Sequence, residues 1–146
     1  MTIGRTVGVY GEAYIQFQLA CRGWVVDAIG ATANGIDLLA WKEGAVSMGI
    51  NVKTRRRDTS GSVTLFKSDI HLEAMRAECR LRGVTPHIAV VVFNERPNRG
   101  YLMTLDLFLA RYRRISRGGT RGTIEFYRTP ADEAKYAADA EILKFG

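Results

Sequence analysis

The sequence predicts an α/β protein in which helices cover both faces of one mixed β-sheet. The first observation is the near-continuous apolar run from His87 to Phe93, which is typical of a central strand buried on both faces. The second is the order of the expected elements, namely a helix, three strands, a helix, two strands and then smaller pieces. Mixed strands and helices around a buried strand indicate a covered sheet.

Residues 7–22 are predicted to form the first helix, because apolar side chains recur there at three- and four-residue steps. Gly23 is the expected stop. Strands should begin at Trp24, cover 36–42 and run from about 45 to 54. Gly-rich and turn-forming residues separate these strands, and a basic polar loop over 55–61 leads to a short strand over 62–66. The buried stripe of the helix is expected to be Val7, Tyr10, Tyr14, Phe17 and Cys21.

The second half of the chain continues the alternation. A helix over 68–82 can be capped by Ser68 or Asp69 and stopped by Gly83. Its apolar positions should be Ile70, Leu72, Met75, Cys79 and Leu81. The remaining elements are expected to be strands over 87–93 and 101–104, a helix over about 105–114, an edge strand over 123–127 and an Ala-rich helix over 131–144. The strand 87–93 and the region 101–109 are also candidates for a dimer surface.

Composition and cysteine usage indicate a single soluble domain spanning residues 1–146. The chain of 146 residues is 47% apolar and 25% charged, as in ordinary globular proteins. Cys21 and Cys79 lack zinc-type spacing, which favours a reducing compartment. No apolar run approaches the roughly 20 residues of a membrane span, and no signal-peptide pattern is visible. We therefore expect a cytoplasmic protein with no membrane contact.

The charge of the chain favours a polyanionic partner. The formal net charge is +6 and the pI is about 9.6, and nucleic acid is the commonest polyanion in the cytoplasm. Any one basic cluster is more often a solvated surface than a binding site, but three clusters together favour nucleic acid. The clusters are Lys53 to Arg57, then Arg76, Arg80 and Arg82, then Arg111, Arg113, Arg114, Arg117 and Arg121.

Polar residues interrupt two neighbouring apolar strands. Asp37 lies near the start of the strand 36–42, and Asn51 and Lys53 lie near the end of the next strand. Polar groups in buried strands need a partner or a purpose. Because neighbouring strands are about 4.8 Å apart, these side chains can converge on one small volume that suits a divalent metal and a phosphate. Glu12, off the predicted helical stripe, can supply a second carboxylate.

Each of these residues also has a purely structural interpretation. Asp37 alone would be a turn residue at a strand start, and Lys53 alone a surface lysine at a strand end. Glu12 alone would be an acid favoured in the first turn of a helix. A site is favoured because the three residues together resemble, in order and context, the motifs of a known nuclease family.

These residues resemble the motifs of the PD-(D/E)xK nuclease superfamily and, within it, of the archaeal-type Holliday-junction resolvases. The resemblance covers about residues 8–93, which leaves 94–146 as a C-terminal elaboration. It implies a restriction-endonuclease-like fold, with a mixed central sheet flanked by helices on both faces. The matching segments are Gly11-Glu12, Gly23-Trp24, Asp37-Leu38-Leu39-Ala40 and Asn51-Val52-Lys53.

The resemblance implies a DNA endonuclease that uses Mg²⁺ or Mn²⁺ and hydrolyses phosphodiesters in branched DNA during recombination and repair. A four-way junction has two symmetric cleavage points, so a homodimer is expected. The implied catalytic residues are Glu12, Asp37, Asn51 and Lys53, and the implied metal ligands are Glu12, Asp37, Asn51 and the Val52 carbonyl. Gln16 can support the metal site or a phosphate, or can be an ordinary solvated helix residue. Thr32, Arg55, Arg56 and Arg57 are expected to contact DNA.

The chain departs from the superfamily at Asn51, where the motif has Glu or Gln. Asn offers a carbonyl oxygen but no charge, and its side chain is one methylene shorter, which predicts weaker metal binding. An inactive DNA-binding module on a nuclease fold is therefore one alternative. A repair or restriction-type nuclease acting on other DNA structures is another. A basic RNA- or ribosome-associated protein would explain the charge but would leave Asp37, Asn51 and Lys53 without a role.

Overall fold

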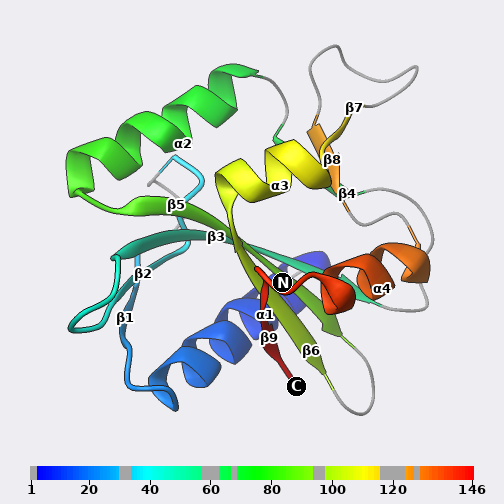
Figure 1. The fold of residues 1–146 in the computed structure, drawn as a ribbon, viewed down its shortest axis with the longest axis horizontal. Helices are drawn as coiled ribbons and strands as arrows, with labels where there is room; N and C mark the ends of the chain where they lie inside the picture. Colours follow the sequence, from blue (N-terminus) through cyan, green and yellow to red (C-terminus); the bar gives the residue numbers. More distant parts are fainter. Residues whose placement is uncertain are drawn as a thin grey trace.

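The computed structural model describes residues 3–29, 34–56, 63–66, 69–93, 98–115, 124–126 and 129–146. In these residues, four helices pack around a six-stranded sheet, and three further strands form a separate small sheet (Figure 1). The elements are α1 (Ile3–Ala20), β1 (Val25–Ala28), β2 (Leu38–Trp41), β3 (Met48–Arg56), β4 (Val63–Phe66), α2 (Asp69–Arg82), β5 (Thr85–Phe93), β6 (Arg99–Thr104), α3 (Leu105–Arg111), β7 (Arg114–Ile115), β8 (Ile124–Phe126), α4 (Pro130–Ala138) and β9 (Leu143–Phe145).

The large sheet is mixed, as the sequence predicts. Its strand order is β1-β2-β3-β5-β6-β9, and among its neighbouring strands only β3 and β5 are parallel. A parallel pair needs a crossover connection, and here β4 and α2 lie between the two strands. The pairing of β3 with β5 runs from Met48 opposite Thr85 to Arg56 opposite Phe93.

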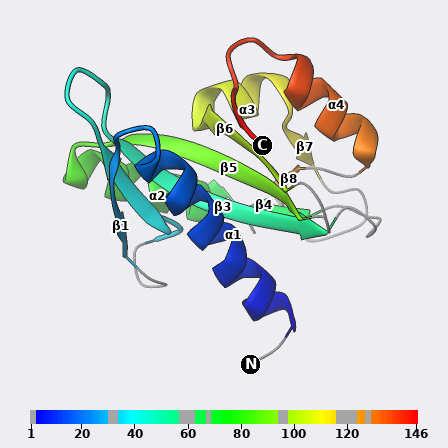
Figure 2. The same ribbon diagram turned by 90° about the horizontal axis from the view of Figure 1, so that it is seen from below.

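Helices cover both faces of this sheet. α1 lies against one face, where Ile15 and Leu19 pack on Leu38, Ile50 and other strand residues (Figure 2). α2, α3 and α4 supply apolar side chains to the core on the opposite face. The predicted fold class is therefore confirmed. No helix in the described part of the chain is long and apolar enough to cross a membrane.

The strand β5 and the segment after it belong to the core. Residues 88–91 of β5 are fully buried, and Val92 is 2% exposed. In the region 101–109, the side chains of Tyr101, Leu102, Met103, Leu105 and Phe108 are also buried. The buried side chains of these segments therefore belong to the core and are not available for a dimer surface, whereas Thr104 and Asp106 are exposed.

The buried face of α1 differs from the predicted stripe. The helix buries Gly11, Ile15 and Leu19, which are spaced four residues apart. Phe17 is 64% exposed. α1 has apolar side chains on more than one face, and periodicity alone does not decide which face meets the sheet. Of the predicted stripe, Val7 and Tyr14 are half-buried, whereas Tyr10, Phe17 and Cys21 are exposed.

Glycine ends both long helices, as predicted. Gly23 and Gly83 have φ values of 87° and 68°, which lie in the left-handed region that favours glycine. The Trp24 N–H donates to the Leu19 carbonyl at 3.1 Å, and the Val84 N–H donates to the Cys79 carbonyl at 3.0 Å. Both ends are Schellman motifs. On α2, Leu72, Met75 and Cys79 are buried as expected, but Ile70 and Leu81 are 79% and 83% exposed.

The predicted terminal helix over 131–144 is wrong in its second half. α4 ends at Ala138, and the chain then forms β9, which pairs with β6 at the edge of the large sheet. Phe145 is 3% exposed and lies opposite Gly100. A Cβ at Gly100 would be only 3.0 Å from the Phe145 ring, so glycine makes room for this ring. The Ala-rich composition favours helix, but burial of Ile142 and Phe145 determines the structure.

Candidate active site

The backbone on both sides of Asp37 is fixed by neighbouring strands. The Asp37 N–H donates to the Ile50 carbonyl at 2.8 Å, and its carbonyl accepts from the Ile29 N–H at 3.0 Å. The Asp37 side chain is held as well, because the Val52 N–H donates to Oδ2 at 2.7 Å. The carboxylate is therefore a rigid group at the point where β2 begins.

Asn51 lies beside Asp37 on the same face of the sheet. Leu38 is opposite Ile50, and one further step of this antiparallel register places Asp37 opposite Asn51. Asn51 is 4% exposed, and its Nδ2 donates to the Gly35 carbonyl at 2.6 Å. This bond fixes the amide orientation, since the opposite orientation would place two oxygens together. The Asn51 Oδ1 is buried and has no hydrogen-bond partner among the described residues.

The turn before β2 brings the Gly35 carbonyl to Asn51. Asn34 and Gly35 have φ values of 52° and 91°, so the backbone turns sharply just before Asp37. A Cβ at Gly35 would lie 3.6 Å from Asn51 Nδ2. This turn therefore connects the segment just before Asp37 to Asn51 through the Gly35 carbonyl.

Lys53 and Glu12 complete the charged part of the site. Lys53 is two residues after Asn51 in β3, so its half-buried side chain projects from the same face. Glu12 comes from α1 and is also half-buried. The charges of Asp37 and Lys53 both act on Glu12, which places the three groups within electrostatic range of one another. The structure therefore brings the predicted Glu12, Asp37, Asn51 and Lys53 together.

Both carboxylates are held in an environment that disfavours their charge. Burial, reinforced by the charge of Asp37, raises the pKa of Glu12, and Lys53 opposes this shift. Burial also raises the pKa of Asp37, although the Val52 N–H and Lys53 both favour its ionised form. The positive charge of Lys53 thus only partly offsets the effect of burial on the two carboxylates. An added cation would stabilise their charged forms.

The donor atoms of the site suit a hard divalent cation. Two carboxylates and the Asn51 Oδ1 are oxygen donors of the kind that Mg²⁺ and Mn²⁺ prefer. The described residues contain no group of three or more His, Cys, Asp or Glu side chains able to hold a metal, so an amide or backbone oxygen has to contribute. Gln16 is half-buried on α1, one turn after Glu12.

Some of the residues predicted to bind DNA or to form basic clusters lie outside the described residues, namely Thr32, Arg57, Arg117 and Arg121. Arg55 and Arg56 end β3, where Arg55 is half-buried and Arg56 is exposed. Arg55 follows Lys53 by two residues and so projects from the face of the sheet that carries Asn51. Arg55 and Arg56 thus add positive charge beside Lys53, toward the C-terminal end of β3.

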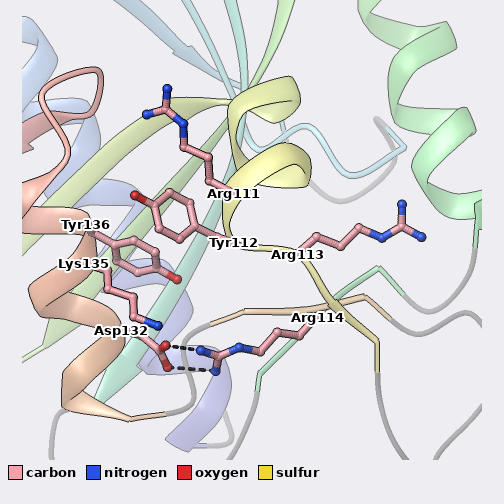
Figure 3. Close-up of a pocket in the computed structure, with 7 residues that line it drawn as sticks. All are labelled: Arg111, Tyr112, Arg113, Arg114, Asp132, Lys135 and Tyr136. Carbon is pink, nitrogen blue, oxygen red and sulfur yellow. Dashed lines mark hydrogen bonds and ion pairs between the residues drawn. The ribbon is translucent and has the colours of Figure 1, made fainter.

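Two of the C-terminal arginines, Arg111 and Arg114, form ion pairs within the protein. Arg111 pairs with Asp139 at 2.7 Å and with Glu141 at 2.6 Å, and Arg114 forms a two-pronged pair with Asp132. Arg111, Arg114 and Asp132 border a pocket of about 140 Å³ between α3 and α4. Figure 3 shows that Arg113 points away from the tyrosines lining this pocket. Carboxylates therefore already neutralise two of these arginines.

The α2 cluster is also largely paired. Arg76 lies 3.3 Å from Asp106 and 3.8 Å from Glu73, and Arg82 lies 3.5 Å from Glu78. The pairs Glu73–Arg76 and Glu78–Arg82 can be predicted from the sequence, since their members are three and four residues apart on one helix. The pair of Arg76 with Asp106 cannot be predicted in this way, because Asp106 lies on α3. The cluster therefore carries less net charge than a count of arginines suggests.

The geometry just described belongs to the restriction-endonuclease-like class of α/β folds. The fold is similar to that of Archaeoglobus fulgidus Hjc, a Holliday junction resolvase from an archaeal hyperthermophile, with a TM-score of 0.56 and 16% sequence identity. The match covers 89% of this chain and 92% of that one. No family model matches the sequence, and no curated protein matches it significantly. At this level of identity the comparison establishes the fold alone.

Proposed function

We propose that this protein is a PD-(D/E)xK endonuclease that uses Mg²⁺ or Mn²⁺ to hydrolyse phosphodiester bonds in branched DNA. The observation that carries the proposal is the buried Oδ1 of Asn51, which has no partner among the described residues and lies next to the fixed carboxylate of Asp37. Leaving a buried acceptor unsatisfied costs about 1–3 kcal/mol, so such an atom calls for a ligand. A cation that also contacts Asp37 and Glu12 would satisfy it.

The assignment gives each residue a chemical task. Asp37, Glu12, Asn51 and the Val52 carbonyl would hold the metal, which supplies an activated water and neutralises phosphate charge. The hydrogen bond from the Val52 N–H keeps the Asp37 carboxylate in position. Lys53 orients the attacking water and stabilises the charge that develops on the phosphate. Gln16 would support Glu12 from the next turn of α1.

Branched DNA is the proposed substrate because the resolvase fold extends over nearly the whole chain. A four-way junction presents two symmetry-related cleavage points, so we propose that two copies of this chain act as a homodimer. The mass of the protein in solution, measured alone and with a junction, tests this part independently of cleavage. A monomer in both states would contradict it.

The central test is cleavage of labelled four-way junction, flap and linear duplex DNA with Mg²⁺ or Mn²⁺. Wild-type protein should cut the junction, while Asp37→Ala and Lys53→Ala should not. Cleavage of flap or duplex DNA in preference to the junction would indicate a repair or restriction-type nuclease. Wild-type activity in the Asp37→Ala protein would contradict the proposed site.

Asn51 favours a second candidate, a DNA-binding module with an inactive nuclease site. The amide brings no negative charge to the metal, unlike the Glu found in many members of the superfamily. This candidate requires tight junction binding with no product in either metal. Strong preference for RNA over every DNA form would remove both candidates.

We further propose that Arg55, Arg56 and Arg57 bind DNA phosphates next to the site. Each arginine that stops neutralising a phosphate should reduce the slope of log K against log salt by about 0.9. Replacing the three arginines with Ala should therefore flatten the salt dependence of junction binding. An unchanged slope would mean that the protein binds the phosphates elsewhere on its surface.

A further inference from the structure

We propose that Gly11 is a positioning residue, whose close contact with Thr54 sets the distance between Glu12 on α1 and the Asn51–Lys53 segment of β3. This inference rests on the proposed function, since it concerns how the metal-binding carboxylates are brought together. Glycine is needed at position 11 because any larger residue would push α1 away from the sheet.

The first step is the contact itself. Gly11 is buried, and a Cβ built there would overlap Thr54 Oγ1 and lie 2.9 Å from Thr54 Cβ. Distances under 3.0 Å between such atoms require something to shift. The Thr54 hydroxyl is itself buried and makes no hydrogen bond to a described residue, so it serves here as a packing group.

The second step is the position of this contact along β3. β2 pairs with Met48, Gly49 and Ile50, and the described pairing with β2 ends there. Beyond Ile50, β3 continues to Arg56 beside β5, and α1 passes next to this part of the strand. Thr54 and Val52 project toward α1, whereas Asn51 and Lys53 project from the other face.

The third step joins the contact to the site. Glu12 directly follows Gly11, and Lys53 directly precedes Thr54. Glu12 originates on the helix that covers one face of the sheet, yet it interacts electrostatically with Asp37 and Lys53. Beyond Ile50, where β3 no longer pairs with β2, the close approach of α1 to β3 allows the Glu12 carboxylate to reach the site. A larger distance between α1 and β3 would move this carboxylate away from the site.

The chain offers a matched control on the same helix. A Cβ at Gly8 would meet no described atom within 4 Å. Gly8→Ala and Gly11→Ala therefore remove the same helix-weakening residue, but only the second meets Thr54. Thr54→Gly removes every Thr54 side-chain atom that the new Cβ would touch, so it should rescue Gly11→Ala.

The experiment measures Mn²⁺ affinity by calorimetry for wild type, Gly8→Ala, Gly11→Ala, Thr54→Gly and the Gly11→Ala/Thr54→Gly double variant. Gly11→Ala should weaken binding by about 10- to 100-fold, the range for residues that orient metal ligands. Gly8→Ala should bind as wild type does, and the double variant should recover most of the affinity. Wild-type affinity in Gly11→Ala would overturn the proposal.

If Gly11→Ala fails to fold, the double variant decides the matter, since a folded double variant that still binds Mn²⁺ weakly would overturn the proposal. A second readout does not depend on metal. The amide ¹H–¹⁵N shifts of Asn51 and Val52, neither of which adjoins a substituted position, should move in Gly11→Ala and return in the double variant, and unchanged shifts would also overturn it. If wild type binds no Mn²⁺, the proposed function fails, while these shifts still decide the role of Gly11.

Discussion

Two groups of carboxylates in the described part of the chain lie in contrasting electrostatic environments. Near the end of β3, Asp37 and Glu12 share one lysine, and burial raises the pKa of both. Around α4, three acids each pair with a different arginine. There, Asp132 pairs with Arg114, Glu133 with Arg99, and Asp139 with Arg111.

Asp139 shows the second region most clearly. Hydrogen bonds from Arg111 and Tyr112 lower the pKa of Asp139 to about 2. The charge of Asp139 is thus strongly favoured in the folded protein, whereas the charge of Asp37 is disfavoured. This difference in pKa distinguishes acids that stabilise the fold through ion pairs from acids whose charge a bound cation would stabilise.

Removing the charge of Asp37 should give the largest effect on activity. Asp37→Asn keeps an oxygen for the Val52 N–H but removes the negative charge that a metal requires. We expect DNA cleavage to fall by at least about 10²–10³-fold with the fold intact. Asp139→Asn is the matched control, since it neutralises an acid of the other region and should leave cleavage unchanged. Equal decreases in the two variants would erase the proposed distinction.

Removing a paired acid should give the largest effect on stability. Asp132 accepts from Arg114 and from the Thr129 N–H at 2.9 Å, so it also caps α4. Asp132→Ala should therefore lower the free energy of unfolding by about 1–3 kcal/mol, which is about 2–4 °C in Tm for each kcal/mol. Thermal unfolding followed by circular dichroism measures this. A Tm equal to that of wild type would show that the pair is not stabilising.

The sequence predicts the adjacency of Asp37 and Asn51 better than the ion pairs around α4, because these two candidate site residues are polar positions in neighbouring apolar strands. Asp37 and Asn51 could be paired from the alternation and adjacency of two strands alone. The partners of the C-terminal arginines could not be predicted, since Asp132 and Asp139 lie 18 and 28 residues from Arg114 and Arg111. Only the folded arrangement of α3 and α4 brings those charges together.

The errors in the fold have a similar cause. α1 has apolar side chains on more than one face, and the buried face includes Gly11 against Thr54, a tertiary contact that periodicity does not reveal. The end of α4 depends on the free edge of β6, which β9 fills. Helix stops at Gly23 and Gly83, by contrast, follow from a local backbone requirement and were predictable.

The two regions should respond to pH with stability contributions of opposite sign. A raised pKa means that stability is lost as pH rises through the range between the ordinary value, 3.8 for Asp37, and the raised one. A lowered pKa means that the contribution of Asp139 is complete above about 4 and is lost as pH falls toward about 2. In metal-free buffer at pH 7, Asp37→Asn should therefore raise Tm and Asp139→Asn should lower it. Both differences should shrink in acid, and the same sign at pH 7 would contradict the comparison.

The smallest expected effect comes from converting Asn51 into an acid. Asn51→Asp loses the hydrogen bond to the Gly35 carbonyl, which contributes about 0.5–1.5 kcal/mol to the stability of the metal-free protein. The buried charge that it places near this carbonyl destabilises the metal-free protein further. The added charge should strengthen cation binding, so the rise in Tm on adding Mn²⁺ should exceed that of wild type. Asn51→Ala is the control, because it loses the same hydrogen bond without adding charge, and its Mn²⁺-induced rise should be smaller than that of wild type. If the Asp and Ala variants respond alike to Mn²⁺, residue 51 does not face the cation, and the buried Oδ1 has another explanation.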